Sequence, residues 1–191
     1  QRSMSESAYS APPTALSIRP AVIHDAADIL EIIQPFVDED IVLPIPVYRL
    51  YERIRDFVVA EKEGVIVGCG SLIIMWHDLA EIRSLVVRKG CQGGGIGHHI
   101  VETLVDEAIM LGIAKVFALT YETGFFERLG FQAVEKETLP HKVWKDCTHC
   151  ARFTHCDEIP VARILIPDGQ KDAGHLPSMP SDTNLIMPSP A

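Results

Sequence analysis

The chain has 191 residues, of which 47% are hydrophobic, and its 26 acidic and 17 basic residues give a formal net charge of −9. This length suits one domain, and the apolar content is ample for one core. The negative charge would repel the phosphates of nucleic acids and of anionic lipid headgroups, so neither a nucleic acid nor a membrane is expected as a partner.

Apolar periodicity and turn residues predict one α/β domain over residues 18–166, between disordered tails at 1–17 and 167–191. The expected elements are a strand at 17–21, helices at 24–37 and 47–54, strands at 56–62, 65–76 and 80–87, a helix from 98 to about 111 ended by Gly112, a strand at 114–120, a short helix at 123–129, and strands at 131–135 and 158–166. This order predicts a mixed, mostly antiparallel sheet, with a meander followed by a right-handed βαβ crossover around the long helix.

The connection before that helix, RKGCQGGGIG (88–97), holds five glycines in ten residues. Glycine disfavours both strand and helix, but it lets an anion approach the free N–H groups of a helix start. The loop therefore predicts a phosphate-binding site; a glycine-rich connection without a ligand is the alternative. The loop lacks the GK[ST] of a P-loop and the context of a dinucleotide fingerprint, whereas Q-x-x-G-x-G fits at Gln92, Gly95 and Gly97.

Together with IRPAVIHDAADI (18–29) and FFERLGF (125–131), this motif resembles the GCN5-related N-acetyltransferase (GNAT) superfamily over residues 18–166. The resemblance implies the GNAT fold, in which the βαβ unit binds acetyl-CoA and the glycine loop holds its pyrophosphate. Homodimers are common in that superfamily, so the resemblance leaves a homodimer open.

Three further segments are similar to the short, single-domain N-acetylglutamate synthases: residues 57–87, 116–131 and 139–150. Those enzymes acetylate the α-amine of glutamate in the first step of arginine biosynthesis. The resemblance therefore implies direct acetyl transfer from acetyl-CoA to an amino acid in a ternary complex.

The resemblance also implies which residues bind acetyl-CoA. The backbone at the end of the strand before the loop would contact the pantetheine arm, the loop would hold the pyrophosphate, and FFERLGF would lie beside the thiol. The strand residues are Leu85, Val86 and Val87, and the residue of FFERLGF is Phe126. The residues of the loop and the helix start are Gln92, Gly93, Gly94, Gly95, Ile96, Gly97 and His98. Arg88 and Lys89 either add positive charge near the nucleotide or are solvated loop charges.

Glu81 is the expected general base, directly or through water, by resemblance to the related synthases. A surface-facing strand carboxylate is the alternative. Strand alternation would place Glu81, Arg83, Leu85 and Val87 on one face, so that Glu81 and Arg83 point together. Arg83 could then bind a substrate carboxylate through two hydrogen bonds, or form a structural ion pair with Glu81 or another acid. Lys142 and Lys145 are further carboxylate-binding candidates, or plain surface lysines.

Two features depart from the family pattern. Many GNAT enzymes carry a tyrosine as general acid where this chain has Phe126, so the thiolate leaves unprotonated or another donor serves, such as Tyr121, Thr120 or Thr123. The segment LPIP (43–46) also lacks the basic residue expected there. An acceptor with a neutral side chain, such as glutamine, therefore stays open.

Three of the five cysteines lie within ten residues, which favours a reducing cytoplasm over a disulfide scaffold. Cys147, Cys150 and Cys156 with His149 could hold a structural zinc ion; free thiols are the alternative. No apolar run approaches the roughly 18 residues of a membrane span, and the N-terminus lacks the apolar core of a secretory signal.

Three functions are consistent with these residues. The first is an amino-acid N-acetyltransferase with glutamate as the leading substrate. The second is acetylation of another amine, such as glutamine, a polyamine, an antibiotic or a protein N-terminus. The third is a non-catalytic acetyl-CoA-binding module.

Overall fold

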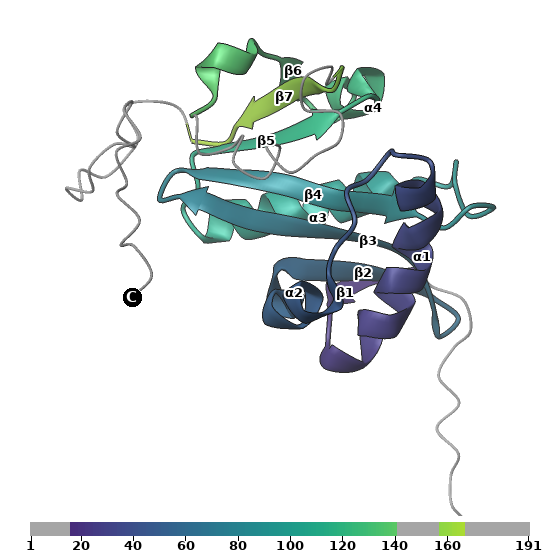
Figure 1. The fold of residues 1–191 in the computed structure, drawn as a ribbon. Coiled ribbons are helices and arrows are strands. Elements are labelled where there is room, and N and C mark those ends of the chain that lie inside the picture. Colours follow the sequence, from purple (N-terminus) through teal and green to yellow (C-terminus); the bar gives the residue numbers. More distant parts are fainter. Residues whose placement is uncertain (1–15, 141–156, 167–191) are drawn as a thin grey trace, which may run out of the picture.

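The computed structural model of the chain describes residues 16–140 and 157–166 (Figure 1). Its strands and helices, apart from three 3₁₀ turns, are β1 (Ser17–Pro20), α1 (Ala26–Asp38), α2 (Val47–Glu52), β2 (Phe57–Lys62), β3 (Val65–Trp76), β4 (Leu79–Val87), α3 (Ile96–Met110), β5 (Lys115–Thr120), α4 (Thr123–Glu127), β6 (Gln132–Ala133) and β7 (Ile159–Ile164). The predicted element order is confirmed. The tails predicted at 1–17 and 167–191 lie almost wholly outside the described residues, and their extents stay predictions.

The strands form one seven-stranded sheet in the order β1-β2-β3-β4-β5-β7-β6. Only β4 and β5 pair in parallel among the described strands; every other neighbouring pair is antiparallel. This confirms the predicted mixed, mostly antiparallel sheet. Helix α3 covers one face, whereas α1 and α2 cover the other (Figure 1).

Most boundaries follow the sequence signals. Gly64, with φ of 76°, forms the β2–β3 turn, and Gly112, with φ of 75°, follows the end of α3. The strand predicted at 131–135 is shorter in the structure. Phe131 does not begin it, because its N–H donates to the carbonyl of Phe126 and its ring is buried in the core.

The close approach of α3 to the sheet depends on two glycines of β3. A Cβ added at Gly70 would lie 2.8 Å from Ile100 Cγ2, and one at Gly68 would lie 3.0 Å from Ile100 Cδ1. Ile100 and Leu104 are fully buried over these positions. A side chain at either glycine position would therefore push the helix away from the sheet.

The start of α1 is fixed to the edge of the sheet by an ion-paired network. The carboxylate of Asp25 accepts the N–H of Val22 at 2.8 Å and pairs with Arg19 Nη1 at 2.7 Å. Arg19 also donates from Nε to Glu61 of β2 at 2.9 Å. The hydrogen bonds from Arg19 hold the pKa of Asp25 below its ordinary value. No helix among the described residues is both long and apolar enough to cross a membrane.

Substituting Gly70→Ala should lower the free energy of unfolding by about 1–3 kcal/mol, the usual cost of overpacking a core. The contacted atom belongs to a β-branched side chain, which has little rotamer freedom to move aside. Urea unfolding would measure the loss. Gly94→Ala is the control, because no atom lies within 4 Å of its Cβ position and its φ is not positive. Equal stability of the two variants would contradict this account of the helix contact.

Candidate active site

The candidate site lies where β4 separates from β5. The two strands pair only through Leu79 with Lys115, Ala80 with Val116, and Glu81 with Phe117. Beyond Glu81, β4 continues to Val87 along β3, and the described strands give it no partner on the β5 side. The backbone edge from residue 82 to residue 87 can therefore offer N–H and C=O groups to an extended ligand.

A β-bulge interrupts β4 within this edge. Cys69 pairs with Val86 and Ser71 pairs with Arg83, so Ser84 and Leu85 together face the single residue Gly70. Ser84 has a φ of 51°, a left-handed conformation that is uncommon outside glycine.

Because of the bulge, the prediction that four alternating residues of β4 share one face is wrong. Leu85 and Val87 do not share the face of Glu81 and Arg83; they pack with Ile82 on the face covered by α3. Simple alternation fails because the extra residue at the bulge shifts the pattern by one position. The structure does bring Glu81 and Arg83 together on the face away from α3.

Glu81 and Arg83 form an ion pair, with Arg83 Nε 2.7 Å from Glu81 Oε2. Glu81 is only 3% exposed, so the surface-facing alternative for this residue is wrong. The Arg83 side chain is 25% exposed and can reach a ligand from the same position. A buried carboxylate in an ion pair is costly to desolvate, and such groups are concentrated at functional sites.

The glycine loop leads directly into α3. Gly95 is the N-cap with φ of 78°, so the helix begins at Ile96, two residues earlier than the sequence predicts. The loop residues from Gln92 to Gly95 are exposed, and no atom lies within 4 Å of a Cβ added at Gly93 or Gly94. The first N–H groups of a helix lack intrahelical partners, so this open start fits a phosphate.

Not every glycine of the loop serves the same purpose. A Cβ at Gly97 would lie 3.3 Å from the Phe125 ring, so this residue makes room for α4. His98 is exposed at the loop, where a ligand could contact it. Phe126 is buried, with its ring edge-on to Phe125 and Phe131, and belongs to the α3 side of the core.

The basic residues of the loop are paired with acids. Arg88 Nη1 lies 2.9 Å from Glu31 of α1, and Lys89 Nζ pairs with Glu39 just after that helix. Arg88 Nε also donates to the carbonyl of Ile66. Both side chains therefore tie the loop to α1, a role that their sequence positions did not indicate.

Several predicted site residues lie outside the described residues: Lys142, Lys145, Cys147, His149, Cys150 and Cys156. Their carboxylate-binding and zinc-binding roles stay predictions. Within residues 16–140 and 157–166, no group of three or more His, Cys, Asp or Glu side chains is arranged to hold a metal ion.

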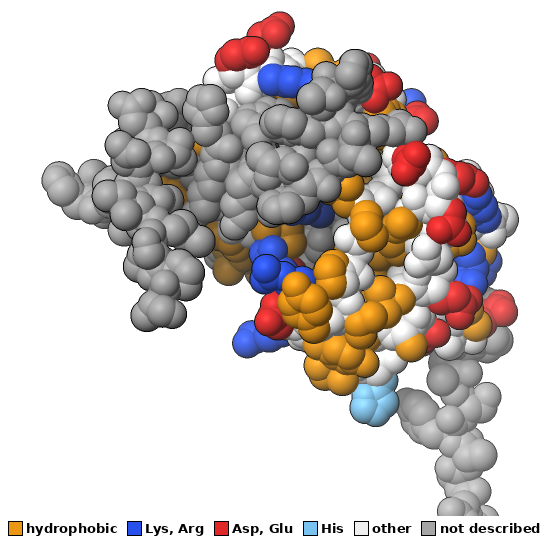
Figure 2. Space-filling view, viewed as in Figure 1, with side chains coloured by type: hydrophobic (Ala, Val, Ile, Leu, Met, Phe, Trp, Pro, Cys, Tyr) orange, Lys and Arg blue, Asp and Glu red, His pale blue; other side chains and the backbone are white. Residues whose placement is uncertain are grey.

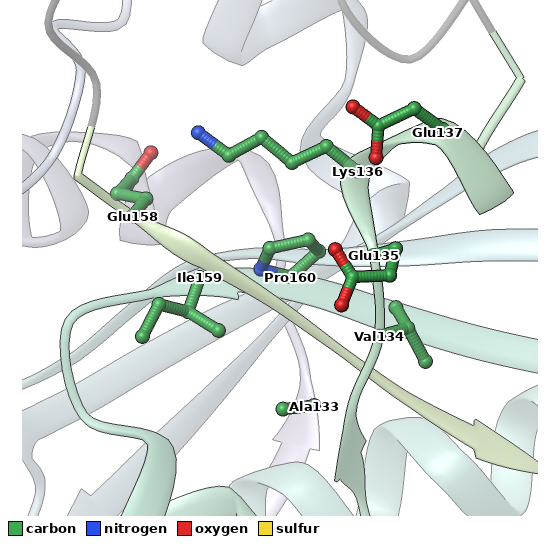
Figure 3. Close-up of a pocket in the computed structure, with 8 residues that line it drawn as sticks. All are labelled: Ala133, Val134, Glu135, Lys136, Glu137, Glu158, Ile159 and Pro160. Carbon is green, nitrogen blue, oxygen red and sulfur yellow. The ribbon is translucent and has the colours of Figure 1, made fainter.

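Two surface features of the structure involve none of the predicted site residues. Figure 2 shows apolar side chains gathered around α2 and the segment before it, where Leu43, Val47, Tyr48 and Tyr51 are exposed. A pocket of about 370 Å³ lies between residues 133–137 and 158–160 (Figure 3), and Glu135, Glu137 and Glu158 make its lining acidic. None of the residues predicted for acetyl transfer lines this pocket.

Comparison with known proteins matches this geometry to one family. Residues 25–131 match the acetyltransferase (GNAT) family model. An uncharacterized N-acetyltransferase of Chlorobaculum tepidum is 39% identical over 81% of this chain and 99% of its own length. An amino-acid acetyltransferase of Mycobacterium tuberculosis is 37% identical over 68% of this chain and 75% of its own length.

Solved structures show the same fold. A Mycobacterium tuberculosis protein in complex with CoA is 32% identical, with a TM-score of 0.68, over 78% of this chain and 99% of that one. The N-acetylglutamate synthase of Neisseria gonorrhoeae, complexed with CoA and N-acetyl-glutamate, is 29% identical with a TM-score of 0.73. The match covers 82% of this chain but 37% of that synthase, so this chain spans just over a third of its length.

A mixed sheet that opens between β4 and β5, with an exposed glycine loop at the start of α3, defines an α/β protein with a candidate anion-binding loop. The chain belongs to the GNAT family of acetyltransferases, and it is an acetyltransferase that uses acetyl-CoA.

Substituting Gly95→Val should weaken acetyl-CoA binding at least tenfold. A β-branched residue resists the left-handed conformation by about 1–2 kcal/mol and would displace the N–H groups at the start of α3. Calorimetric titration with acetyl-CoA would measure the affinity.

Gly112→Val is the matched control, because Gly112 has nearly the same φ, 75°, at the opposite end of α3 and has no atom within 4 Å of its Cβ position. Both variants should lose similar stability, but only Gly95→Val should lose affinity. Unchanged binding in Gly95→Val would overturn the assignment of the loop to the pyrophosphate.

Proposed function

We propose that this protein transfers the acetyl group of acetyl-CoA to the α-amine of an amino acid, with L-glutamate as the leading substrate. This reaction is the first step of arginine biosynthesis. The observation that carries the proposal is the buried ion pair of Glu81 and Arg83 at the point where β4 leaves β5. Relatives named amino-acid acetyltransferase and a structural neighbour named N-acetylglutamate synthase support it.

The acetyl-CoA site consists of the glycine loop and the free edge of β4. The N–H groups at the start of α3 bind the pyrophosphate, with Gln92 to Gly97 and His98 around it. Leu85, Val86 and Val87 bind the pantetheine arm through their backbone, since their side chains pack in the core or against it. This placement directs the thioester towards the position where the two strands separate.

Glu81 and Arg83 perform the acceptor chemistry. Arg83 binds a carboxylate of the amino acid, which competes with Glu81 for the same guanidinium. As Arg83 turns to the substrate, Glu81 becomes a stronger proton acceptor. The ammonium group of the acceptor first loses one proton to solvent, and the neutral amine then forms its bond to the thioester carbon. A second proton passes from the nitrogen to Glu81, directly or through water, and the carbon–sulfur bond breaks with its electron pair left on sulfur.

The identity of the amino acid depends on the surface around α2. Ile45 and Pro46 of the LPIP segment stand where a basic residue would have matched a second carboxylate. This observation favours glutamine as the second candidate acceptor. Lys142 and Lys145 would favour glutamate, if they reach the substrate.

Three further proposals concern the location of the enzyme in the cell, a structural metal ion and the oligomeric state. Its cysteine-rich segment supports a reducing cytoplasm as its location. A structural zinc ion on Cys147, Cys150, Cys156 and His149, and a homodimer, stay predictions.

The acceptor can be identified by a thiol-release assay. Purified protein should release CoA from acetyl-CoA with glutamate, glutamine or both, and not with the other common amino acids or with spermidine. Spermidine tests whether the net charge of −9 selects a cationic acceptor. Turnover with spermidine alone would replace the amino-acid proposal. Acetyl-CoA binding without turnover on any of these amines would point to a non-catalytic module.

Substituting Glu81→Gln should lower kcat by about 10²-fold or more, the usual range for loss of a general base. The acetyl-CoA affinity should change by no more than a few-fold, because Glu81 lies outside the loop. Steady-state kinetics and calorimetric titration would measure the two quantities.

Glu61→Gln is the matched control for this variant. Glu61 is also a strand carboxylate paired with an arginine, at 2.8 Å from Arg19 Nη2, but it lies on β2 away from the site. A loss of activity of the same size in both variants would show that the effect of Glu81→Gln is structural.

A further inference from the structure

The β4 bulge is held by two side chains of β3 that the proposed chemistry does not use. Ser71 donates its hydroxyl to the carbonyl of Arg83 at 3.1 Å. The Cys69 thiol donates to the carbonyl of Ser84 at 3.6 Å. Arg83 is the residue before the bulge, and Ser84 is the bulge residue in the left-handed conformation.

Both donors are enclosed in the protein. Ser71 is 1% exposed, and Cys69 is completely buried. Burial raises the pKa of the Cys69 thiol, so it keeps its proton and stays a donor at neutral pH. A buried hydroxyl that makes a hydrogen bond to the backbone of the neighbouring strand fixes that backbone in one position.

The bulge needs such fixing because its conformation is strained. A non-glycine residue at φ of 51° is disfavoured on its own and persists only when its surroundings hold it. The strained residue directly follows Arg83, so any relaxation of the bulge would rotate the backbone that carries the guanidinium.

We propose that Ser71 is a positioning residue for acetyl transfer: by holding the Arg83 carbonyl, it directs the Arg83 side chain towards Glu81 and the acceptor. This inference rests on the proposed function. Cys69 is the second donor and holds the following carbonyl, on the side that leads to the acetyl-CoA edge of β4. Ser71 itself is assigned no substrate contact, because its side chain is buried and its hydroxyl is bonded to the backbone of β4.

The geometry predicts an unequal effect on the two substrates. Ser71 contacts the residue that binds the acceptor, whereas the glycine loop lies beyond the bulge at the other end of the edge. Loss of the hydroxyl should therefore affect the acceptor more than acetyl-CoA. A small displacement of a binding group can cost up to about 10²-fold in rate.

The test compares Ser71→Ala with two other variants in steady-state kinetics, using the amino acid that the wild-type enzyme turns over. For Ser71→Ala we expect kcat/KM for the amino acid to fall at least tenfold, while the KM for acetyl-CoA changes less than twofold. Ser71→Thr keeps the hydroxyl and should restore most of the activity. Alanine is close in size to serine, so this variant is expected to fold.

Ile66→Val is the stability control. Ile66 is a buried residue of the same strand, in the same cluster as Cys69, and it makes neither of the two hydrogen bonds to the bulge carbonyls. Its Tm should fall by an amount similar to that of Ser71→Ala, with no change in kcat/KM.

Each outcome bears on the proposal. Unchanged kinetics in Ser71→Ala, or an equal loss in Ile66→Val, would overturn the positioning role and leave the proposed function intact. Absence of turnover by the wild-type enzyme on every amino acid would overturn the proposed function, and the positioning role with it.

Discussion

The packing of α3 on β3 is the constraint on which the site depends. Gly68 and Gly70 leave room for Ile100, so the helix lies close to the sheet and its N-terminus is fixed beside the end of β4. The residues between and after these glycines, Cys69 and Ser71, face the other way and hold the β4 bulge. Because side chains alternate along a strand, one short segment of β3 sets both the helix and the bulge.

The distribution of charge explains how an acidic chain can bind an anionic ligand. Arg88 and Lys89 adjoin the glycine loop, but they are paired with Glu31 and Glu39. The positive potential at the loop must therefore come mainly from the backbone N–H groups at the start of α3. These dipoles are fixed by the fold, whereas in the proposed reaction Arg83 must exchange Glu81 for a substrate carboxylate. In that proposal, backbone dipoles bind one substrate and a side-chain charge binds the other.

Local sequence signals predicted most of the fold but not the details of the site. β3 was predicted at its observed bounds, and Gly112 at the end of α3, because these depend on neighbouring residues. The bulge at Ser84 has no such signal, since it requires donors on another strand. Alternation therefore placed Glu81 and Arg83 together correctly but failed for Leu85. The contact of Gly97 with Phe125 has no local signal either, because it joins two segments that are distant in the sequence.

The position of Phe126 links the packing to the proposed chemistry. Its ring lies against Phe125 and Phe131 in the core, where a tyrosine hydroxyl would need a buried partner. The chain thus has an apolar contact where many relatives have a proton donor. A thiol is acidic enough to leave without that donor. In the proposed reaction, the transfer of a proton from the amine to Glu81 therefore matters more. Arg83 has to hold the acceptor in line during that transfer.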